Sequence, residues 1–141
     1  MNRYLYQNLD QTVDAQAMSL IQWSYFRRQN NNVAYYFHYT SREIVFKIMS
    51  DRKLKPTWSR VTQFGHGVFL TELDPCTSDD ELLENNYRGN YKYNERIQYA
   101  IAIPKHQIRA IQILDNYNRN IYRCDYEIDL DSVDFRLISR D

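Results

Sequence analysis

The segment Tyr35–Leu73 constrains the fold more than any other part of the chain. The β-branched and aromatic run of residues 33–39 leads into it and predicts a buried strand. Thr40 and Glu43 then match a capping box, a hydroxyl followed three residues later by a carboxylate, which predicts the start of a helix. Residues 64–71 read Phe-Gly-His-Gly-Val-Phe-Leu-Thr and predict a short strand entered through two glycines. The segment therefore predicts a strand, a helix and a second strand.

The helix of this segment is expected to start at about Ser41. Its apolar positions, which we expect to be buried, are Ile44, Val45, Ile48 and Met49. His38 lies just before it, where the strand meets the helix N-terminus. Free backbone N–H groups and the positive end of the helix dipole gather at such a point and favour phosphate or ribose oxygens. His38 is therefore a candidate ligand-binding residue.

The rest of the chain predicts two more helices and several strands. Residues 10–29 read as a helix that ends at three consecutive asparagines. Its expected apolar face is Val13, Ala17, Leu20, Ile21 and Tyr25. A capping box from Ser78 to Glu81 predicts a short helix that ends at about residue 86. Strands are expected at 68–71, 97–103, 107–114, 121–130 and 133–138. This order predicts an α+β fold with an N-terminal helix and few short helices.

A length of 141 residues fits a single domain. We expect an N-terminal helical segment, residues 1–32, packed on a core of residues 33–141. The 18 basic residues balance the 18 acidic ones, so strong non-specific attraction to nucleic acid or anionic membrane is not expected. No apolar run is long enough for a membrane span, and the two cysteines lack metal-ligand spacing. We therefore expect a soluble, cytoplasmic protein with reduced thiols, no metal and no membrane partner.

Four stretches of the chain resemble the motifs of a known enzyme family. His38-Tyr39-Thr40 resembles a histidine motif, and residues 64–71 resemble the Phe-Gly-x-Gly-Ile-Tyr-Phe segment of the poly(ADP-ribose) polymerases. Arg96–Pro104 resembles the core strand that follows, and Glu127–Leu130 resembles an acidic strand. Over about residues 33–138, the chain resembles the HYD1-type ADP-ribosyltransferases, relatives of the poly(ADP-ribose) polymerases and of diphtheria-toxin-like catalytic domains. The resemblance implies an ADP-ribosyltransferase-like split β-sheet core.

The resemblance also implies an activity and a set of site residues. NAD would be the co-substrate, and ADP-ribose would pass to an acceptor that is a protein or a nucleic acid. His38 would bind the adenosine-side ribose, Phe69 would stack on nicotinamide, and Glu127 would orient the other ribose, with Asp125 as the alternate carboxylate. The implied NAD-binding residues are His38, Tyr39, Thr40, Gly67 and Phe69. Strand alternation alone places Asp125, Glu127 and Asp129 on one face and does not choose among them.

Phe69 stands where the family usually has tyrosine, so the ring face is retained and the phenol hydrogen bond is lost. This leaves open an alternative to the transferase, a module that binds NAD or ADP-ribose with weak or no turnover. A third possibility is phosphate-transfer or RNA-end chemistry on a related fold. That chemistry needs several basic residues around the histidine strand, and the sequence places Arg42, Lys47 and the more distant Arg60 near it.

Overall fold

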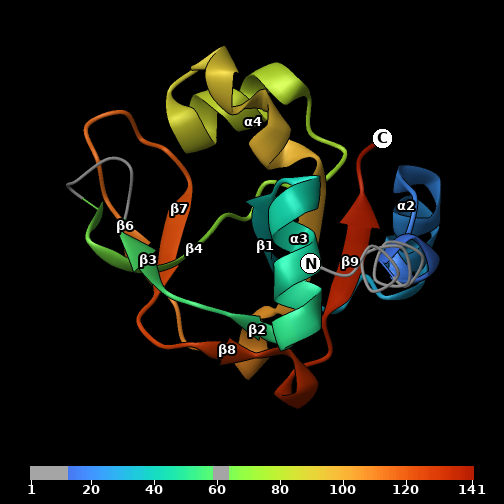
Figure 1. The fold of residues 1–141 in the computed structure, drawn as a ribbon. Helices are drawn as coiled ribbons and strands as arrows, with labels where there is room; N and C mark the ends of the chain where they lie inside the picture. Colours follow the sequence, from blue (N-terminus) through green and yellow to red (C-terminus); the bar gives the residue numbers. More distant parts are fainter. Residues whose placement is uncertain (1–12, 59–63) are drawn as a thin grey trace, which may run out of the picture.

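Antiparallel sheets form the core of the protein in the computed structural model, which describes residues 13–58 and 64–141 (Figure 1). The first sheet has the order β1-β5-β9, from β1 (Tyr35–Thr40), β5 (Tyr99–Pro104) and β9 (Arg136–Ser139). All six residues of β5 are buried, because this central strand has apolar packing on both faces. The motif strand β1 is therefore fixed against the best-buried strand of the domain.

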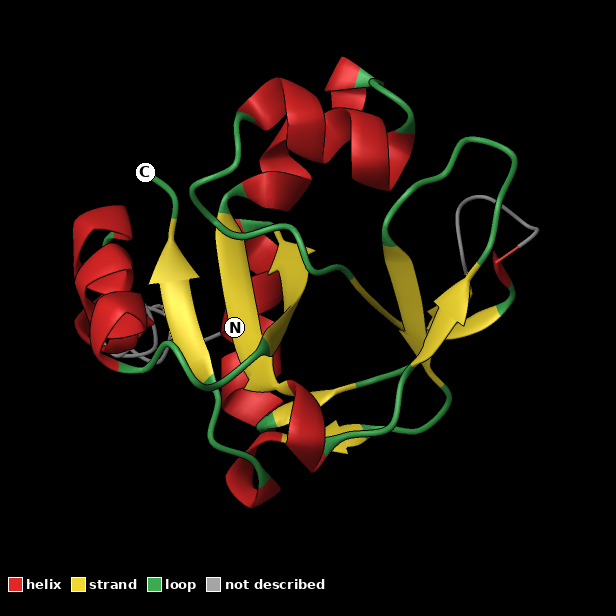
Figure 2. Ribbon diagram, turned by 180° about the vertical axis from the view of Figure 1, so that it is seen from behind, coloured by secondary structure: helices red, strands yellow, loops and turns green. Residues whose placement is uncertain are grey.

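A second sheet has the order β3-β4-β7-β6 and a third pairs β2 with β8. The bounds are β2 (Lys53–Leu54), β3 (Thr57–Trp58), β4 (His66–Leu70), β6 (Ile111–Ile113), β7 (Ile121–Cys124) and β8 (Ile128–Asp129). Seen from behind, the two larger sheets lie side by side with helices above them (Figure 2). The expected mixture of sheet and few helices is confirmed, and the sheets are antiparallel.

The two larger sheets meet at the end of β4. The backbone N–H of Phe37 in β1 donates to the carbonyl of Thr71 at 2.7 Å, and the N–H of Thr71 donates to the carbonyl of Phe37 at 2.9 Å. We call this two-bond bridge the seam. It brings the histidine strand beside the Gly-x-Gly strand, although they are separated in the sequence by α3 (Arg42–Asp51).

Three α-helices of eight or more residues lie in the described part of the chain: α2 (Leu20–Gln29), α3, and α4 (Asp79–Tyr87). The 3-10 helices are η2 (Tyr91–Ile97), η3 (Lys105–Gln107) and η4 (Leu130–Ser132). α4 begins at Ser78, whose side chain accepts from the N–H of Glu81 at 3.2 Å, as the capping box predicts. None of the described helices is long and apolar enough to cross a membrane.

The N-terminal helix is not continuous, in contrast to the expectation for residues 10–29, of which 10–12 lie outside the described part. Residues 13–16 are helical, and a new helix starts after Ser19, which forms a capping box with Gln22. Between them Met18 pairs with β9: its N–H donates to the carbonyl of Leu137, and its carbonyl accepts from Ser139, both at 2.8 Å. Pairing with the sheet therefore replaces a helical turn.

The apolar face predicted for this helix is also partly wrong. Ile21 is 84% exposed and Tyr25 is 63% exposed, whereas Trp23 is fully buried. Trp23 packs edge-on against Phe37, and its indole N–H donates to Asp74 at 3.0 Å. Because α2 starts after Ser19 as a separate helix, the helical period of residues 13–17 does not continue into it. Its buried face is the one that carries Trp23.

The start of α3 differs from the prediction by one residue. Thr40 stays in β1, paired with Tyr99, so it cannot cap the helix. Ser41 is the N-cap, and its side chain accepts from the N–H of Ile44 at 3.2 Å. The helix buries Val45, Ile48 and Met49, as expected.

The predicted strand 121–130 is divided in two, and this change bears on function. β7 ends at Cys124, the chain bends at Asp125, and β8 starts at Ile128. β7 pairs with β4 and β6, whereas β8 pairs with β2. β7 and β8 belong to different sheets. The alternation that placed Asp125, Glu127 and Asp129 on one face therefore does not hold across the bend.

Asn85 of α4 connects the seam to β7. Its side-chain amide donates to the hydroxyl of Thr71 at 3.2 Å and to the carbonyl of Asn120 at 2.9 Å. Its side-chain oxygen accepts from the N–H of Asn120 at 2.7 Å. One buried side chain thereby satisfies backbone groups just before β7 and a side chain at the end of β4.

We predict that Asn85→Ala lowers the free energy of unfolding by about 2 kcal/mol or more, because it leaves buried groups of Asn120 unpaired. Urea unfolding measures this change. The exposed Asn94→Ala is the matched control and should stay within about 0.5 kcal/mol of wild type. An Asn85→Ala protein as stable as wild type would show that this connection is not a stabilising one.

Candidate functional site

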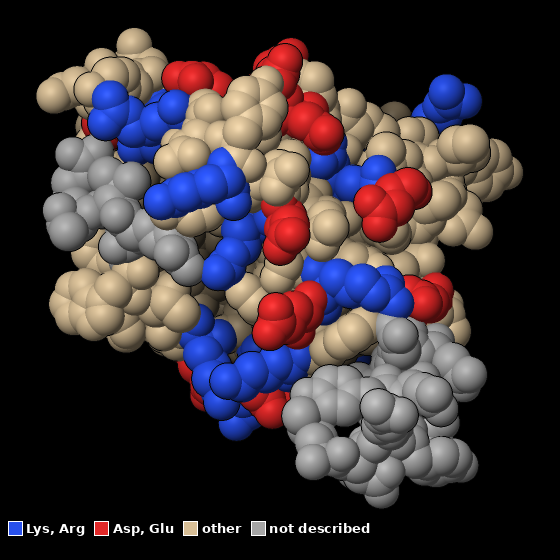
Figure 3. Space-filling view, turned by 45° about the horizontal axis from the view of Figure 1, so that its top comes forward, with Lys and Arg blue, Asp and Glu red and all other residues tan. Residues whose placement is uncertain are grey.

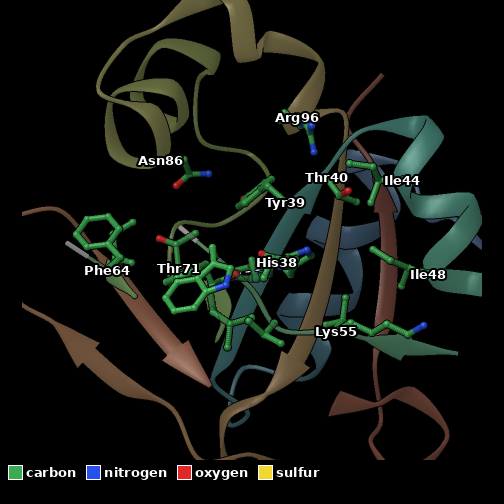
Figure 4. Close-up of a pocket in the computed structure, with 18 of the residues that line it drawn as sticks. His38, Tyr39, Thr40, Ile44, Ile48, Lys55, Phe64, Thr71, Asn86 and Arg96 are labelled. Carbon is green, nitrogen blue, oxygen red and sulfur yellow. Dashed lines mark hydrogen bonds between the residues drawn. The ribbon is translucent and has the colours of Figure 1, made fainter. Parts of the chain in front are cut away.

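A cleft of about 510 Å³ lies beside the seam (Figure 4). β1 contributes residues from Phe37 to Thr40, and β4 contributes residues from Val68 to Leu70. Apolar residues of α3 form one side, where Figure 4 shows Ile44 and Ile48, and Phe64 lies on the opposite side. His38 and Phe69, which the sequence places on separate strands, therefore line the same cleft.

The His38 imidazole is held by the partner strand. Its Nδ1 lies 2.9 Å from the carbonyl oxygen of Phe69. A carbonyl can only accept, so Nδ1 carries the proton in this hydrogen bond. In the neutral ring Nε2 is then an acceptor, and none of the described residues hydrogen-bonds to it. His38 can therefore accept a hydrogen bond from a hydroxyl in the cleft.

Burial lowers the pKa of His38 below its ordinary value of 6.5, and the hydrogen bond to Phe69 opposes this shift only in part. The ring is thus neutral at neutral pH. A neutral acceptor suits a ribose hydroxyl, whereas a charged imidazolium would donate from both nitrogens. The charge state and the hydrogen-bond geometry of the ring therefore both leave Nε2 as a hydrogen-bond acceptor.

Tyr39 and Thr40 both line the cleft, and both are buried. The hydroxyl of Tyr39 donates to the carbonyl of Leu73 at 2.6 Å, and burial raises the pKa of this phenol. Thr40 lies at the end of β1, beside the N-terminus of α3. Both residues therefore lie at the cleft, and the hydroxyl of Tyr39 is already engaged with the chain after the seam.

Phe69 is half-buried and forms an aromatic wall with Phe64, with the ring centroids 6.3 Å apart. The guanidinium of Arg119 lies 4.8 Å from the centre of the Phe64 ring. Arg119 is itself fixed by a buried ion pair with Asp115, at 2.6 Å. Burial alone would raise the pKa of Asp115, but the hydrogen bonds and charge of Arg119 lower it below its ordinary value. The wall is therefore supported from behind by a fixed charge pair.

Gly67 is required by a close approach of β7. A Cβ at this position would lie 2.4 Å from Cγ of Arg123 and 2.9 Å from the carbonyl oxygen of Cys124. Arg123 passes over Gly67 to donate to the carbonyl of Phe64 at 2.9 Å. The second glycine of the motif thus allows the arginine that holds the aromatic wall in place.

Neither predicted carboxylate is among the described residues that line the cleft. Asp125 is paired with Arg123 at 2.6 Å, at the bend after β7. The Glu127 carboxylate lies 3.8 Å from Nζ of Lys53, which does line the cleft. The carboxylate that does line it, within the described ranges, is Asp51, 3.5 Å from Nζ of Lys55. Of the residues predicted to act in catalysis, His38 and Phe69 therefore line the cleft, and the two carboxylates lie outside its described lining.

Basic side chains surround the cleft more densely than the sequence suggests. The lining includes Lys47, Lys53, Lys55 and Arg96. Figure 3 shows Lys and Arg side chains around a hollow on this face, with acidic ones between them. Of these four, the sequence predicted only Lys47 near the histidine strand; β2 and η2 bring Lys53 and Arg96 to the cleft, and Lys55 follows β2. Four cations suit a ligand that carries phosphates.

The cleft also contains residues that no motif singled out. Trp58 in β3 lines it and is 76% exposed, and Ile121 lines it from the start of β7. The sequence signal for Trp58 was a large aromatic residue shortly after two lysines, a pattern too short to interpret alone. Within residues 13–58 and 64–141, no three His, Cys, Asp or Glu side chains are grouped so that they could hold a metal ion.

Comparison of the chain with protein families, with curated proteins and with solved structures finds no match.

The pH dependence of the free energy of unfolding tests the protonation state of His38 in the folded protein. Because its pKa is lowered in the folded state, the unfolded state takes up the proton first as the pH falls. The free energy of unfolding should therefore decrease as the pH falls through about 6.5. We predict that this decrease between about pH 7.5 and about pH 5.5, measured by urea unfolding, is smaller in His38→Asn than in wild type. His66 and His106 remain in both proteins, so an equal decrease would contradict the assignment.

Proposed function

We propose that the cleft beside the seam binds NAD and that the protein is an NAD-dependent ADP-ribosyltransferase. The observation that carries the proposal is the His38 imidazole, held through Nδ1 by the Phe69 carbonyl so that Nε2 is left as an acceptor. A ribose hydroxyl would donate to Nε2, while nicotinamide would stack on the Phe69 ring of the same strand. The hydrogen bond between His38 and the Phe69 carbonyl would thereby fix the ribose-binding ring relative to the strand that carries the stacking ring.

The size and lining of the cleft support a dinucleotide. Its volume of about 510 Å³ lies within the range of roughly 300–1,000 Å³ that is usual for small-molecule sites. The aromatic wall of Phe64 and Phe69 offers a flat apolar surface for one ring. The cations around the cleft offer partners for a pyrophosphate. These features favour a ligand with planar rings, ribose hydroxyls and phosphates, as NAD has.

Transfer of ADP-ribose is the reaction that the motif resemblance implies. Cleavage of the nicotinamide–ribose bond breaks a glycosidic C–N bond, and positive charge develops on the ribose as in glycoside hydrolysis. A carboxylate near that ribose would stabilise the charge in the transition state. Glu127 is the first candidate because its carboxylate lies at Lys53 on the border of the cleft, and Asp125 is the alternate. The acceptor that takes the ADP-ribose would be a protein or a nucleic acid.

A second candidate function is an NAD- or ADP-ribose-binding module without turnover. The observation that favours it is the position of the carboxylates: Asp125 is engaged with Arg123, and Glu127 lies beyond the described lining of the cleft. On β7, the residue that does line the cleft is the apolar Ile121. Without a carboxylate at the ribose, binding would persist and the charge stabilisation would be lost.

We predict that Phe69→Ala weakens NAD binding by about 1–3 kcal/mol, the usual scale for one ring stacked on a base, and that Phe69→Tyr retains it. Isothermal titration with NAD measures both variants. Phe26→Ala is the matched control, because Phe26 is also half-buried but belongs to α2 and does not line the cleft. Equal NAD affinity in wild type and Phe69→Ala would remove Phe69 from the site.

NAD consumption separates the two candidate functions. If the protein is a transferase, Glu127→Gln should bind NAD nearly normally and turn over roughly a hundredfold more slowly or worse, since the charge it stabilises develops in the transition state. Asp125→Asn is the parallel variant: loss of activity there, with Glu127→Gln intact, would move the role to Asp125. A wild-type protein that binds NAD but consumes none with any acceptor supplied would establish the binding module.

A further inference from the structure

The four cations that line the cleft are not equivalent. Lys53 and Lys55 each form an ion pair with a carboxylate, at 3.8 and 3.5 Å. Within the described part of the chain, the side chains of Lys47 and Arg96 form neither an ion pair nor a hydrogen bond. The positive charge of the cleft that no carboxylate offsets therefore belongs to Lys47 and Arg96.

Arg96 is held at the junction of β1 and α3 by the residues that follow it. The side chain of Gln98 accepts a hydrogen bond from the N–H of Arg42, the first residue of α3, at 3.1 Å. The guanidinium of Arg140 donates to the carbonyl of Ile97 at 2.9 Å, and Ile97 is itself buried. Because the backbone beside it is fixed in this way, Arg96 extends into the cleft from a defined position (Figure 4).

Lys47 lies in the middle of α3, on the helix face that lines the cleft. Asp51, the acidic residue of that face, ends the helix and is already paired with a lysine. Glu43 and Glu95, which flank the junction in the sequence, are exposed and are not among the described residues that line the cleft. The positive charge is therefore concentrated between the middle and the start of α3, where the helix dipole is also positive.

Thr40 adds a hydroxyl between Arg96 and His38. It follows His38 by two residues in β1, so the two side chains share one face of the strand, roughly 7 Å apart. Thr40 is buried and lines the cleft, and none of the hydrogen bonds among the described residues uses its hydroxyl. Figure 4 shows the three residues in the order Arg96, Thr40, His38 down the cleft. A ligand oxygen at this point would satisfy a hydroxyl that is otherwise costly to bury.

This arrangement suits a phosphate attached to a ribose. A planar guanidinium binds a phosphate through two parallel hydrogen bonds, and an ammonium group and a hydroxyl supply further donors. A ribose whose hydroxyl donates to Nε2 of His38 would carry its 5′-phosphate at a distance similar to that between His38 and Thr40. The phosphate would then lie within reach of the Arg96 guanidinium.

We propose that Arg96, with Lys47 and the Thr40 hydroxyl, binds the phosphate next to the ribose held by His38, and that the cleft therefore selects nucleotides over nucleosides. This rests on the proposed NAD site, in which that phosphate is the adenosine-side phosphate of NAD. The two lysines already paired with carboxylates take no part in phosphate binding.

The ion pairs of the cleft fit this placement. Lys53, with the Glu127 carboxylate beside it, comes just after the C-terminal end of α3, whereas Arg96 lies at the N-terminal end. The helix has 10 residues, so roughly 15 Å separate its two ends. A phosphate at Arg96 would therefore not repel the carboxylate that the proposed function assigns to the other ribose.

Titration calorimetry with ADP-ribose tests the role of Arg96. Arg96→Gln should weaken binding by roughly 10- to 150-fold, the scale of hydrogen bonds to a charged group, and Arg96→Lys, which keeps the charge, should weaken it less. Lys55→Gln removes a paired cation of the same cleft and should have a much smaller effect. Lys92→Gln is the matched control outside the cleft, because Lys92 is an exposed cation of η2 that does not line it.

A comparison of AMP with adenosine tests the selection of nucleotides. Wild type should bind AMP at least roughly tenfold more tightly than adenosine, and Arg96→Gln should lose most of this difference. Equal affinity of wild type for the two ligands would show that the cleft does not bind the phosphate. An equal loss of ADP-ribose affinity in Arg96→Gln and Lys55→Gln would show that the cleft attracts anions without a defined phosphate site.

The outcomes also separate this proposal from the proposed function. If wild type binds NAD and ADP-ribose but Arg96→Gln binds ADP-ribose as tightly, the phosphate assignment is wrong and the NAD site stands. If Arg96→Gln loses ADP-ribose but wild type consumes no NAD, the phosphate site stands and the transferase is wrong. If wild type binds neither NAD nor ADP-ribose, both proposals are wrong.

Discussion

The hydrogen bonds at the seam between β1 and β4 are the interactions on which the site depends. The paired backbone bonds of Phe37 and Thr71 join the two larger sheets, and the His38 bond to the Phe69 carbonyl extends this contact into a side chain. Asn85 fixes the same point from α4. Because the sheets are joined here, the cleft is formed by strands whose relative position is set by buried hydrogen bonds. The geometry of His38 and Phe69 is therefore a property of the fold rather than of a mobile loop.

The bend after β7 is the second structural constraint, because the two predicted carboxylates that follow it lie outside the described lining of the cleft. A strand that ran unbroken to residue 130 would have carried its acidic residues on one face. Instead β7 pairs with β4, and β8 pairs with β2. The carboxylate of Asp125 is therefore paired with Arg123, and that of Glu127 with Lys53. In the proposed function, the features that would bind a dinucleotide are thus better formed than the feature that would cleave it. This contrast is the physical basis for separating binding from turnover in the proposed function.

Signals within a few residues of each other predicted the local elements well. The Ser78 cap, the strand ending at Pro104 and the Gly-x-Gly entry to β4 are all decided by neighbouring residues. The errors arose where a distant partner decides the structure. Met18 leaves the helix because β9 supplies its hydrogen bonds, which no local period reveals. For the same reason the sequence pointed to His38 and Phe69 but not to Lys53 and Trp58, which β2 and β3 bring to the cleft.

The most direct test of the central claim is a nitrogen-15 NMR titration of the three histidine rings with NAD. We predict that the His38 ring is neutral with its proton on Nδ1, and that NAD shifts its Nε2 resonance as a ribose hydroxyl donates to it. The proton should stay on Nδ1, hydrogen-bonded to the Phe69 carbonyl, throughout. A His38 ring that carries its proton on Nε2, or an Nε2 resonance that does not move when NAD binds, would contradict the account.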